Sequence, residues 1–134
     1  MESPGELTLE AILAGAEAIG RQDRRIVALD LFGSRASGEA HPGSDVDLGA
    51  LFREPVPLAE LLELEERLGK ALSVPVDLVD AGRASAFLAL DIVRGERLYC
   101  ADEDKADEFD LYVLRRAGDL EPFERERRRV LLTP

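Results

Sequence analysis

The stretch that bears most directly on the fold is LFGSRASGEAHPGSDVDL, residues 31–48. An apolar run leads into it over residues 26–32, with charged residues before it and a glycine after it, which is the pattern of a buried strand. Residues 33–44 contain three glycines, three serines and one proline, and this composition predicts a turn, a short helix and a loop. A second strand is then expected over residues 46–52, so the stretch joins two neighbouring strands.

The flanking sequence supplies further helices and strands, because its apolar residues recur at helical spacing or form short runs. The expected elements are helices over residues 7–21, 58–72, 84–94 and 102–132, and strands over residues 74–79 and 97–100. Gly118 and Pro122 are expected to bend or break the last helix. Together these elements predict one α/β (α+β) domain over residues 1–134, with a C-terminal helical segment at about 102–132. Its small mixed β-sheet would have about four strands packed with helices.

Composition excludes several classes of protein. No apolar run reaches the roughly 20 residues that a membrane-spanning helix needs, and the first residues lack the layout of a secretory signal. Cys100 is the single cysteine, so no internal disulfide can form, and with one histidine a Cys/His zinc site is excluded. We therefore expect a cytoplasmic protein with no membrane partner.

The charge balance bears on partners. The net charge is −11, from 28 acidic and 17 basic residues. Because phosphate contacts dominate nucleic-acid binding, this charge argues against direct binding to DNA or RNA. A nucleoside triphosphate with metal-paired phosphates stays compatible, and so does a basic protein partner.

Asp45 and Asp47 are candidates for metal binding. Alternate residues of a strand share a face, so Asp45-Val46-Asp47 places two carboxylates side by side. Two such charges repel each other unless a cation compensates them, and Mg²⁺ is the natural cation for oxygen ligands and phosphates. An isolated Asp-x-Asp is more often a solvated strand face or a turn cap, so the neighbouring residues decide the interpretation.

Gly33 and Ser34 follow the first strand where the chain turns. Glycine permits close approach of the backbone, and the first amides of a helix favour a phosphate. Ser34 adds a hydroxyl donor, and Arg35 adds a positive charge. Gly-Ser after a strand is by itself most often a turn. Followed by paired carboxylates on the next strand, it favours a nucleotide site.

Asp77 lies in a short apolar strand, where a carboxylate costs free energy unless something pairs with it. The functional interpretation is a third metal ligand that also takes the proton of an attacking hydroxyl. The alternative is an edge-strand aspartate that faces water. Asp80, at the end of the same strand, is expected to cap a turn.

These residues resemble the signature of the DNA polymerase β-like nucleotidyltransferase superfamily. The shared pattern is Gly33-Ser34, ten intervening residues, Asp45-Val46-Asp47 and the later Asp77. The fuller stretch around it is similar to the minimal nucleotidyltransferases (MNT), which are commonly encoded beside HEPN-domain proteins as toxin–antitoxin pairs. The resemblance implies the palm-like fold of polymerase β.

The resemblance also implies roles for the candidate residues. Asp45 and Asp47 would hold two Mg²⁺ ions, Asp77 would bind one of them and help to activate the acceptor hydroxyl, and Gly33, Ser34 and Arg35 would contact the triphosphate. The implied reaction transfers AMP from ATP to a hydroxyl, such as a tyrosine of a partner HEPN toxin. Many relatives have a basic residue where this chain has Ser37, which weakens charge neutralisation at that position.

Alternatives remain open at this point. The chain could be a non-catalytic antitoxin that neutralises its partner by binding, or a small-molecule (antibiotic) nucleotidyltransferase. The cluster Arg125, Arg127, Arg128 and Arg129 is either favourable charge near a helix C-terminus or a surface facing a partner. His41 is expected to be an exposed loop residue. The acceptor, the preferred nucleotide and the oligomeric state are not decided by the sequence.

Overall fold

The computed structural model describes residues 7–40 and 44–132, and it places the side chains of these residues as far as 118. The strands are β1 (Ile26–Phe32), β2 (Val46–Phe52), β3 (Val76–Asp80) and β4 (Glu96–Cys100). The helices are α1 (Leu9–Gln22), α2 (Ser34–Ser37), α3 (Leu58–Leu72), α4 (Ala86–Val93) and α5 (Glu103–Leu132), with a short 3-10 helix, η1 (Ala81–Arg83). The expected mixed α/β class and the four-stranded sheet are confirmed.

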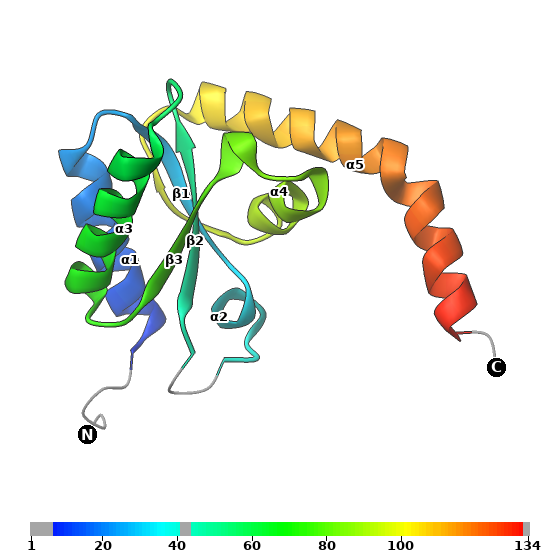
Figure 1. Cartoon of the computed structure of the whole chain (residues 1–134), viewed down its shortest axis with the longest axis horizontal. Coiled ribbons are helices and arrows are strands. Elements are labelled where there is room, and N and C mark those ends of the chain that lie inside the picture. Colours follow the sequence, from blue (N-terminus) through cyan, green and yellow to red (C-terminus); the bar gives the residue numbers. More distant parts are fainter. Residues whose placement is uncertain (1–6, 41–43, 133–134) are drawn as a thin grey trace.

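The sheet has the strand order β3-β2-β1-β4 (Figure 1). β1 runs antiparallel to both of its neighbours, whereas β2 and β3 are parallel. In this register Phe32 lies opposite Asp47, and Asp47 lies opposite Asp77. The pairing therefore brings the end of β1 and the starts of β2 and β3 to one end of the sheet.

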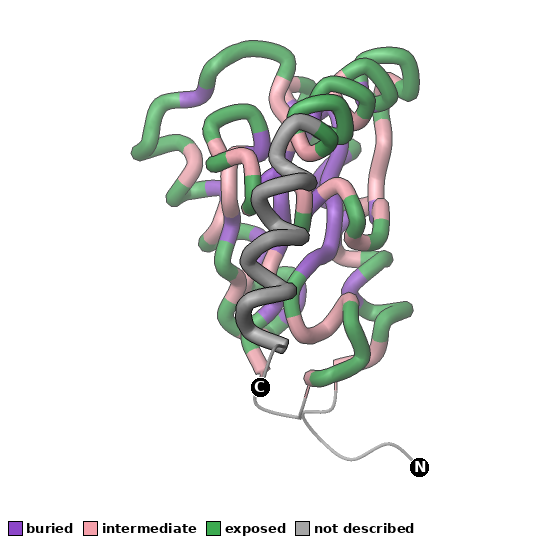
Figure 2. Tube along the Cα trace, turned by 90° about the vertical axis from the view of Figure 1, so that its right-hand side faces the viewer, coloured by how far each residue is buried: buried purple, intermediate pink, exposed green. Residues whose placement is uncertain are grey.

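Helices cover both faces of the sheet. In Figure 1, α1 and α3 lie on one side and α4 with the first part of α5 lies on the other. The larger core joins α1 and α3 to the sheet through residues such as Ile12, Leu68 and Leu31, and a smaller core on the opposite face contains Phe32 and Ile92. Figure 2 shows the buried residues gathered in the central strands. Every residue of β1 is buried, as the apolar run predicted.

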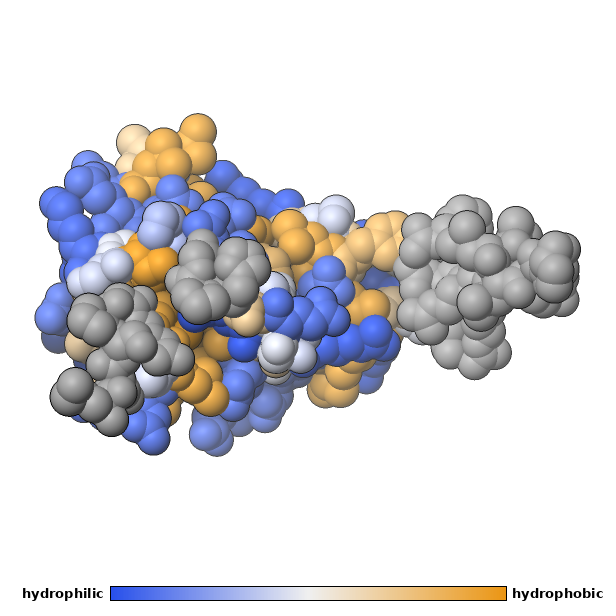
Figure 3. Space-filling model, turned by 90° about the horizontal axis from the view of Figure 1, so that it is seen from below, coloured by the Kyte–Doolittle hydropathy of each residue, from blue (hydrophilic) through white to orange (hydrophobic). Residues whose placement is uncertain are grey.

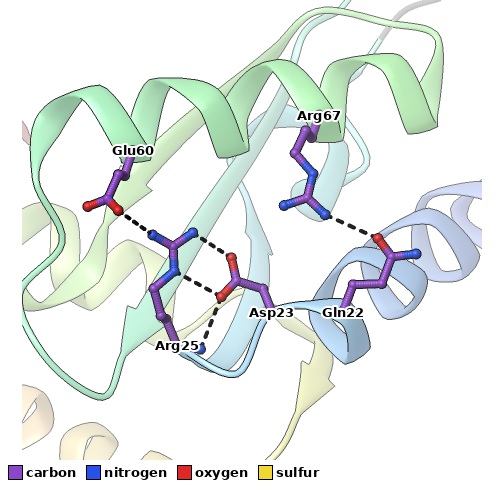
Figure 4. A network of polar contacts seen from close by, with 5 residues as sticks. All are labelled: Gln22, Asp23, Arg25, Glu60 and Arg67. Carbon is purple, nitrogen blue, oxygen red and sulfur yellow. Dashed lines mark hydrogen bonds and ion pairs between the residues drawn. The ribbon is translucent and has the colours of Figure 1, made fainter.

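A polar network ties the connection between α1 and β1 to α3 (Figure 4). The Arg25 guanidinium donates to Asp23 at 2.7 Å and lies 3.4 Å from Glu60 on α3. Arg67 of α3 donates to Gln22 at 3.1 Å. The hydrogen bond from Arg25 lowers the pKa of Asp23, so this carboxylate is stabilised in its charged form at neutral pH.

Some boundaries differ from the sequence prediction for local reasons. α1 begins at Leu9 because the Thr8 side chain caps it, accepting from the Ala11 N–H at 3.1 Å. β3 begins at Val76 rather than residue 74, because the Val74 N–H still donates to the Gly69 carbonyl at the end of α3. Helix α5 is one continuous helix whose second half changes direction in Figure 1, so of the expected bend or break the bend is found. Within the described residues, no helix is long and apolar enough to cross a membrane.

Candidate active site

The turn after β1 depends on glycine. Gly33 has φ +73° and ψ −155°, a conformation that side-chain-bearing residues rarely adopt. A Cβ at this position would collide with the Oδ2 atom of Asp47. The chain then enters α2 at Ser34, and the first N–H groups of any helix lack partners within it. Gly33 therefore lets the backbone of the turn pass close to the Asp47 carboxylate.

Three predicted acidic residues come together next to this turn, and we call them the open acid cluster (Asp45, Asp47 and Asp77). Asp45 is exposed directly before β2, Asp47 is half-buried in β2, and Val46 between them points into the core. Asp77 lies opposite Asp47 on β3. Burial raises the pKa of Asp47, and the neighbouring charges of Asp77 and Asp45 raise it further.

Asp77 itself is exposed on an edge strand. A carboxylate inside an apolar strand was expected to need a partner, but Leu78 takes the buried position and Asp77 faces water. The alternative of an edge-strand aspartate describes its exposure correctly. Its register opposite Asp47 nevertheless keeps it in the open acid cluster.

Among the residues that the structure describes, no cation balances the negative charge of the open acid cluster. None of its members forms an ion pair with a basic side chain that the structure describes. Among the same residues, no group of three or more acidic, histidine or cysteine side chains is arranged so that it could hold a metal ion by itself. Mg²⁺ commonly takes one or two carboxylates and completes its shell with waters and substrate phosphates. The donor set fits a cation of this kind, shared with a nucleotide.

Two other predicted residues have local structural roles. The Arg35 guanidinium donates to the Ser44 carbonyl at 2.7 and 3.2 Å, so it holds the chain that leads into Asp45. Asp80 accepts from the Gly82 N–H at 3.1 Å, which confirms it as a cap. His41 and the side chains of the C-terminal arginine cluster lie outside the described part of the chain.

A cleft of about 710 Å³ opens on the other side of the turn. One wall is formed by the end of β1, the turn and α2, and the facing wall by the end of α4 and the start of β4. Its lining residues are Phe32, Gly33, Ser34, Ala36, Ser37, Glu39, Asp91, Arg94, Gly95 and Glu96. Figure 3 views the molecule from this end, where hydrophilic residues surround small apolar patches. Gly33 and Ser34 thus separate the open acid cluster from a space large enough for part of a nucleotide.

A second group of acids, not predicted from the sequence, surrounds Arg97, and we call it the Arg97 network (Asp30, Arg97, Asp107 and Asp110). Asp30 lies in the middle of β1 and is only 8% exposed. Arg97 lies 3.2 Å from Asp30, 2.9 Å from Asp110 and 3.9 Å from Asp107. Burial raises the pKa of Asp30 to about 6, against the opposing effect of Arg97. The available signal was a charged residue inside the apolar run 26–32.

Comparison with known proteins identifies the class. Residues 16–104 match the family described as "Polymerase beta, Nucleotidyltransferase". The chain belongs to this nucleotidyltransferase family.

Similar proteins narrow the comparison. Protein adenylyltransferase MntA of Shewanella oneidensis is 36% identical over 75 residues, which are 55% of this chain and 54% of that protein. The match thus spans about half the length of this relative. Protein adenylyltransferase MntA of Thermococcus cleftensis is 34% identical over 86 residues, covering 64% of this chain and 87% of the relative.

A solved structure shares the fold over most of the chain. It is the crystal structure of a mutant of the toxin–antitoxin pair MntA–HpeT. The TM-score is 0.69 at 25% identity, and the match covers 87% of this chain and 94% of that chain.

Proposed function

We propose that this chain is a Mg²⁺-dependent protein adenylyltransferase that transfers AMP from ATP to a tyrosine hydroxyl of a HEPN-domain toxin and so acts as its antitoxin. The observation that carries the proposal is the open acid cluster beside the Gly33–Ser34 turn, where three carboxylates lie without an ion pair to any basic side chain in the described part of the chain. Two relatives named protein adenylyltransferase and a structural neighbour from a toxin–antitoxin pair support it.

The residues have separate tasks in this proposal. Asp45, Asp47 and Asp77 would hold two Mg²⁺ ions, which when bound supply positive charge for the phosphates and the leaving group. Gly33 and Ser34 bind the triphosphate through N–H groups and the Ser34 hydroxyl. Arg35 acts through the loop that it holds by its bonds to the Ser44 carbonyl. The protein thus contributes mainly position and electrostatics, as phosphoryl-transfer chemistry requires.

The bonds exchanged follow from the reaction class. The tyrosine oxygen attacks the α-phosphorus of ATP and forms a new P–O bond. The bond from the α-phosphorus to the bridging oxygen breaks, and pyrophosphate leaves. The proton of the tyrosine hydroxyl passes to the Asp77 carboxylate, which is exposed and can meet an acceptor that belongs to another molecule.

Helix α5 offers a surface for that other molecule. It extends beyond the layered part of the protein in Figure 1, and its first half exposes Leu111, Tyr112 and Leu114. Exposed apolar side chains on a projecting helix suit a protein partner. In this proposal residues 1–134 act as one nucleotidyltransferase domain with α5 as its docking segment, and the setting is the cytoplasm.

The test is transfer of labelled AMP. The chain is incubated with ATP labelled at the α-phosphate, Mg²⁺ and the HEPN-domain protein encoded beside it, as wild type and as the double variant Asp45→Ala/Asp47→Ala. We expect label on the partner, and a loss of at least about 1000-fold in the double variant, because the carboxylates that hold the metal are gone. Lys70→Ala, which removes only an exposed pair with Glu66 on α3, should retain full transfer.

Occlusion is the second candidate, and the exposed apolar side chains of α5 favour it. It predicts that wild type and the double variant bind the partner and inhibit it equally, without transfer of label. Label on an added small-molecule hydroxyl, with none on the partner, would instead indicate the antibiotic-type activity. Transfer of label to the partner by wild type alone contradicts both alternatives.

A further inference from the structure

Most of the charged residues that line the cleft are acidic, so an anionic ligand needs a specific positive charge there. Glu39, Asp91 and Glu96 are exposed acids on its walls, and Ser37 is uncharged. Arg94 is the one basic residue among the cleft-lining residues that the structure describes. Any anionic ligand in this cleft must therefore rely on Arg94 or on bound cations.

The backbone holds Arg94 close to the Gly33–Ser34 turn. Arg94 ends α4, and its N–H donates to the Leu90 carbonyl at 3.0 Å. The next residue, Gly95, lies so close to β1 that a Cβ would collide with the Leu31 carbonyl oxygen. Leu31 is two residues before Gly33, so this contact places the α4–β4 turn against the end of β1. Arg94 and Ser34 consequently lie on walls of the same cleft.

The Arg94 side chain is available for a ligand. Within the described residues its exposed guanidinium makes no hydrogen bond and no ion pair. Two other arginines behave differently, since Arg97 is surrounded by three carboxylates and Arg35 is bonded to the Ser44 carbonyl. A guanidinium presents five N–H donors in a planar arrangement that matches phosphate oxygens. A guanidinium without a protein partner, on the wall of a cleft that also includes the proposed phosphate-binding turn, can bind an anionic ligand.

We propose that Arg94 binds the terminal phosphates of the nucleoside triphosphate from the wall opposite Ser34 and Ser37. The inference rests on the proposed function. Transfer requires the α-phosphate to lie beside the open acid cluster, and the Gly33–Ser34 turn lies between that cluster and the cleft. The β- and γ-phosphates then extend past Ser34 on the cleft side, where Arg94 supplies the positive charge that Ser37 lacks.

The test compares nucleotides with and without terminal phosphates. Dissociation constants for ATP and AMP, each with Mg²⁺, are measured by titration calorimetry for wild type, Arg94→Ala, Arg94→Lys and the control Arg21→Ala. Arg21 forms only a surface pair with Glu17 on α1, at 3.0 Å. We expect Arg94→Ala to weaken ATP binding by at least about tenfold and AMP binding by less than about twofold, since one charged contact is lost only for ATP. Arg94→Lys should fall between wild type and Arg94→Ala, because lysine keeps the charge without the planar arrangement.

Two results would overturn the inference while leaving the proposed function intact. The first is equal ATP affinity in wild type and Arg94→Ala. The second is an equal loss for ATP and AMP, which would place the Arg94 contact on another part of the nucleotide. If wild type binds no ATP, the proposed function fails together with the inference. Thermal unfolding of each variant shows whether its fold is retained, so that loss of binding is not mistaken for loss of structure.

Discussion

Two groups of carboxylates lie on or against the sheet and differ in the positive charge that balances them. The open acid cluster (Asp45, Asp47 and Asp77) is half-buried or exposed at one end of β2 and β3, and no described basic side chain pairs with it. In the Arg97 network (Asp30, Arg97, Asp107 and Asp110) a guanidinium lies within 3.9 Å of every acid. Burial raises a carboxyl pKa in both groups, that of Asp47 in one and that of Asp30 in the other.

The difference separates a structural role from a functional one. The acids around Arg97 join β1, β4 and α5, and their negative charge is compensated by a cation of the protein itself. Acids gathered without a cation keep an unfavourable repulsion, which a metal ion and its nucleotide can relieve. Removing Arg97 from the Arg97 network should therefore lower the free energy of unfolding. Removing an acid of the open acid cluster should instead lower only the catalytic activity.

The largest effect is expected for Arg97→Ala. The variant leaves the 8%-exposed Asp30 and its neighbour Asp110 without a cation. Breaking a buried ion pair from one side costs about 3 kcal/mol, because the remaining charge is uncompensated. Urea unfolding at neutral pH measures this loss in the free energy of unfolding.

Arg53→Ala is the matched control. Arg53 pairs with Asp102 at 3.5 Å and donates to the Arg24 carbonyl at 2.9 Å, both at the surface of the protein, so the loss should stay below about 1 kcal/mol. Equal losses in the two variants would mean that the Arg97 network is no more structural than an ordinary surface pair. The contrast with the open acid cluster would then disappear.

The sequence predicted the fold well where the signal was local. Strands β1 and β2 have the predicted bounds, because apolar runs between charges, glycine and proline leave few other options. The start of β3 was wrong because residue 74 also serves the end of α3, where Ser73 has φ +57°. Such sharing of a residue between two elements has no signature in the sequence.

The site shows the same division. Gly33, Ser34, Asp45 and Asp47 are close in sequence, and their grouping was predicted. The pairing of Asp30 with Arg97, 67 residues later, depends on the register of β1 and β4. A carboxylate in an apolar strand was expected to need a partner at Asp77, which is exposed. The residue that fits this expectation is Asp30, which is buried and pairs with Arg97. Only the strand order shows which of the two is central.

A smaller effect is expected for the pH dependence of Asp30→Asn. The pKa of Asp30 is about 6 in the folded protein and about 3.9 in an unfolded chain. Between these values the folded state keeps a proton that the unfolded state has released, so the free energy of unfolding falls as the pH rises. The fall is on the order of 2 kcal/mol and is absent in Asp30→Asn, which cannot ionise. Urea unfolding of both proteins at about pH 4 and pH 7 measures the difference.

Asp23→Asn should show the opposite sign. Its hydrogen bond with Arg25 lowers the pKa of Asp23, so Asp23 stabilises the fold at neutral pH and that contribution is lost as the pH falls. The variant should therefore be less stable than wild type at neutral pH and more nearly equal to it in acid. For Asp30, the contradicting result is a free energy of unfolding of Asp30→Asn that changes with pH as much as that of wild type. Ionisation of Asp30 would then carry no free-energy cost in the folded protein.

The smallest effect is expected for the stability of Asp47→Asn without metal. The substitution removes a charge that burial, Asp77 and Asp45 all disfavour, so the free energy of unfolding should rise by about 0.5–1 kcal/mol. Asp80→Ala, three positions beyond Asp77, should instead lower it by about as much, because the Asp80 carboxylate caps η1. When Mg²⁺ and ATP are added, wild type should gain stability and Asp47→Asn should not, since only a bound ligand shifts the folding equilibrium. If Asp47→Asn is more stable than wild type and gains no stability from the ligand, the repulsion in the open acid cluster serves ligand binding. If Asp47→Asn is less stable than wild type, Asp47 has a structural role like that of the acids in the Arg97 network.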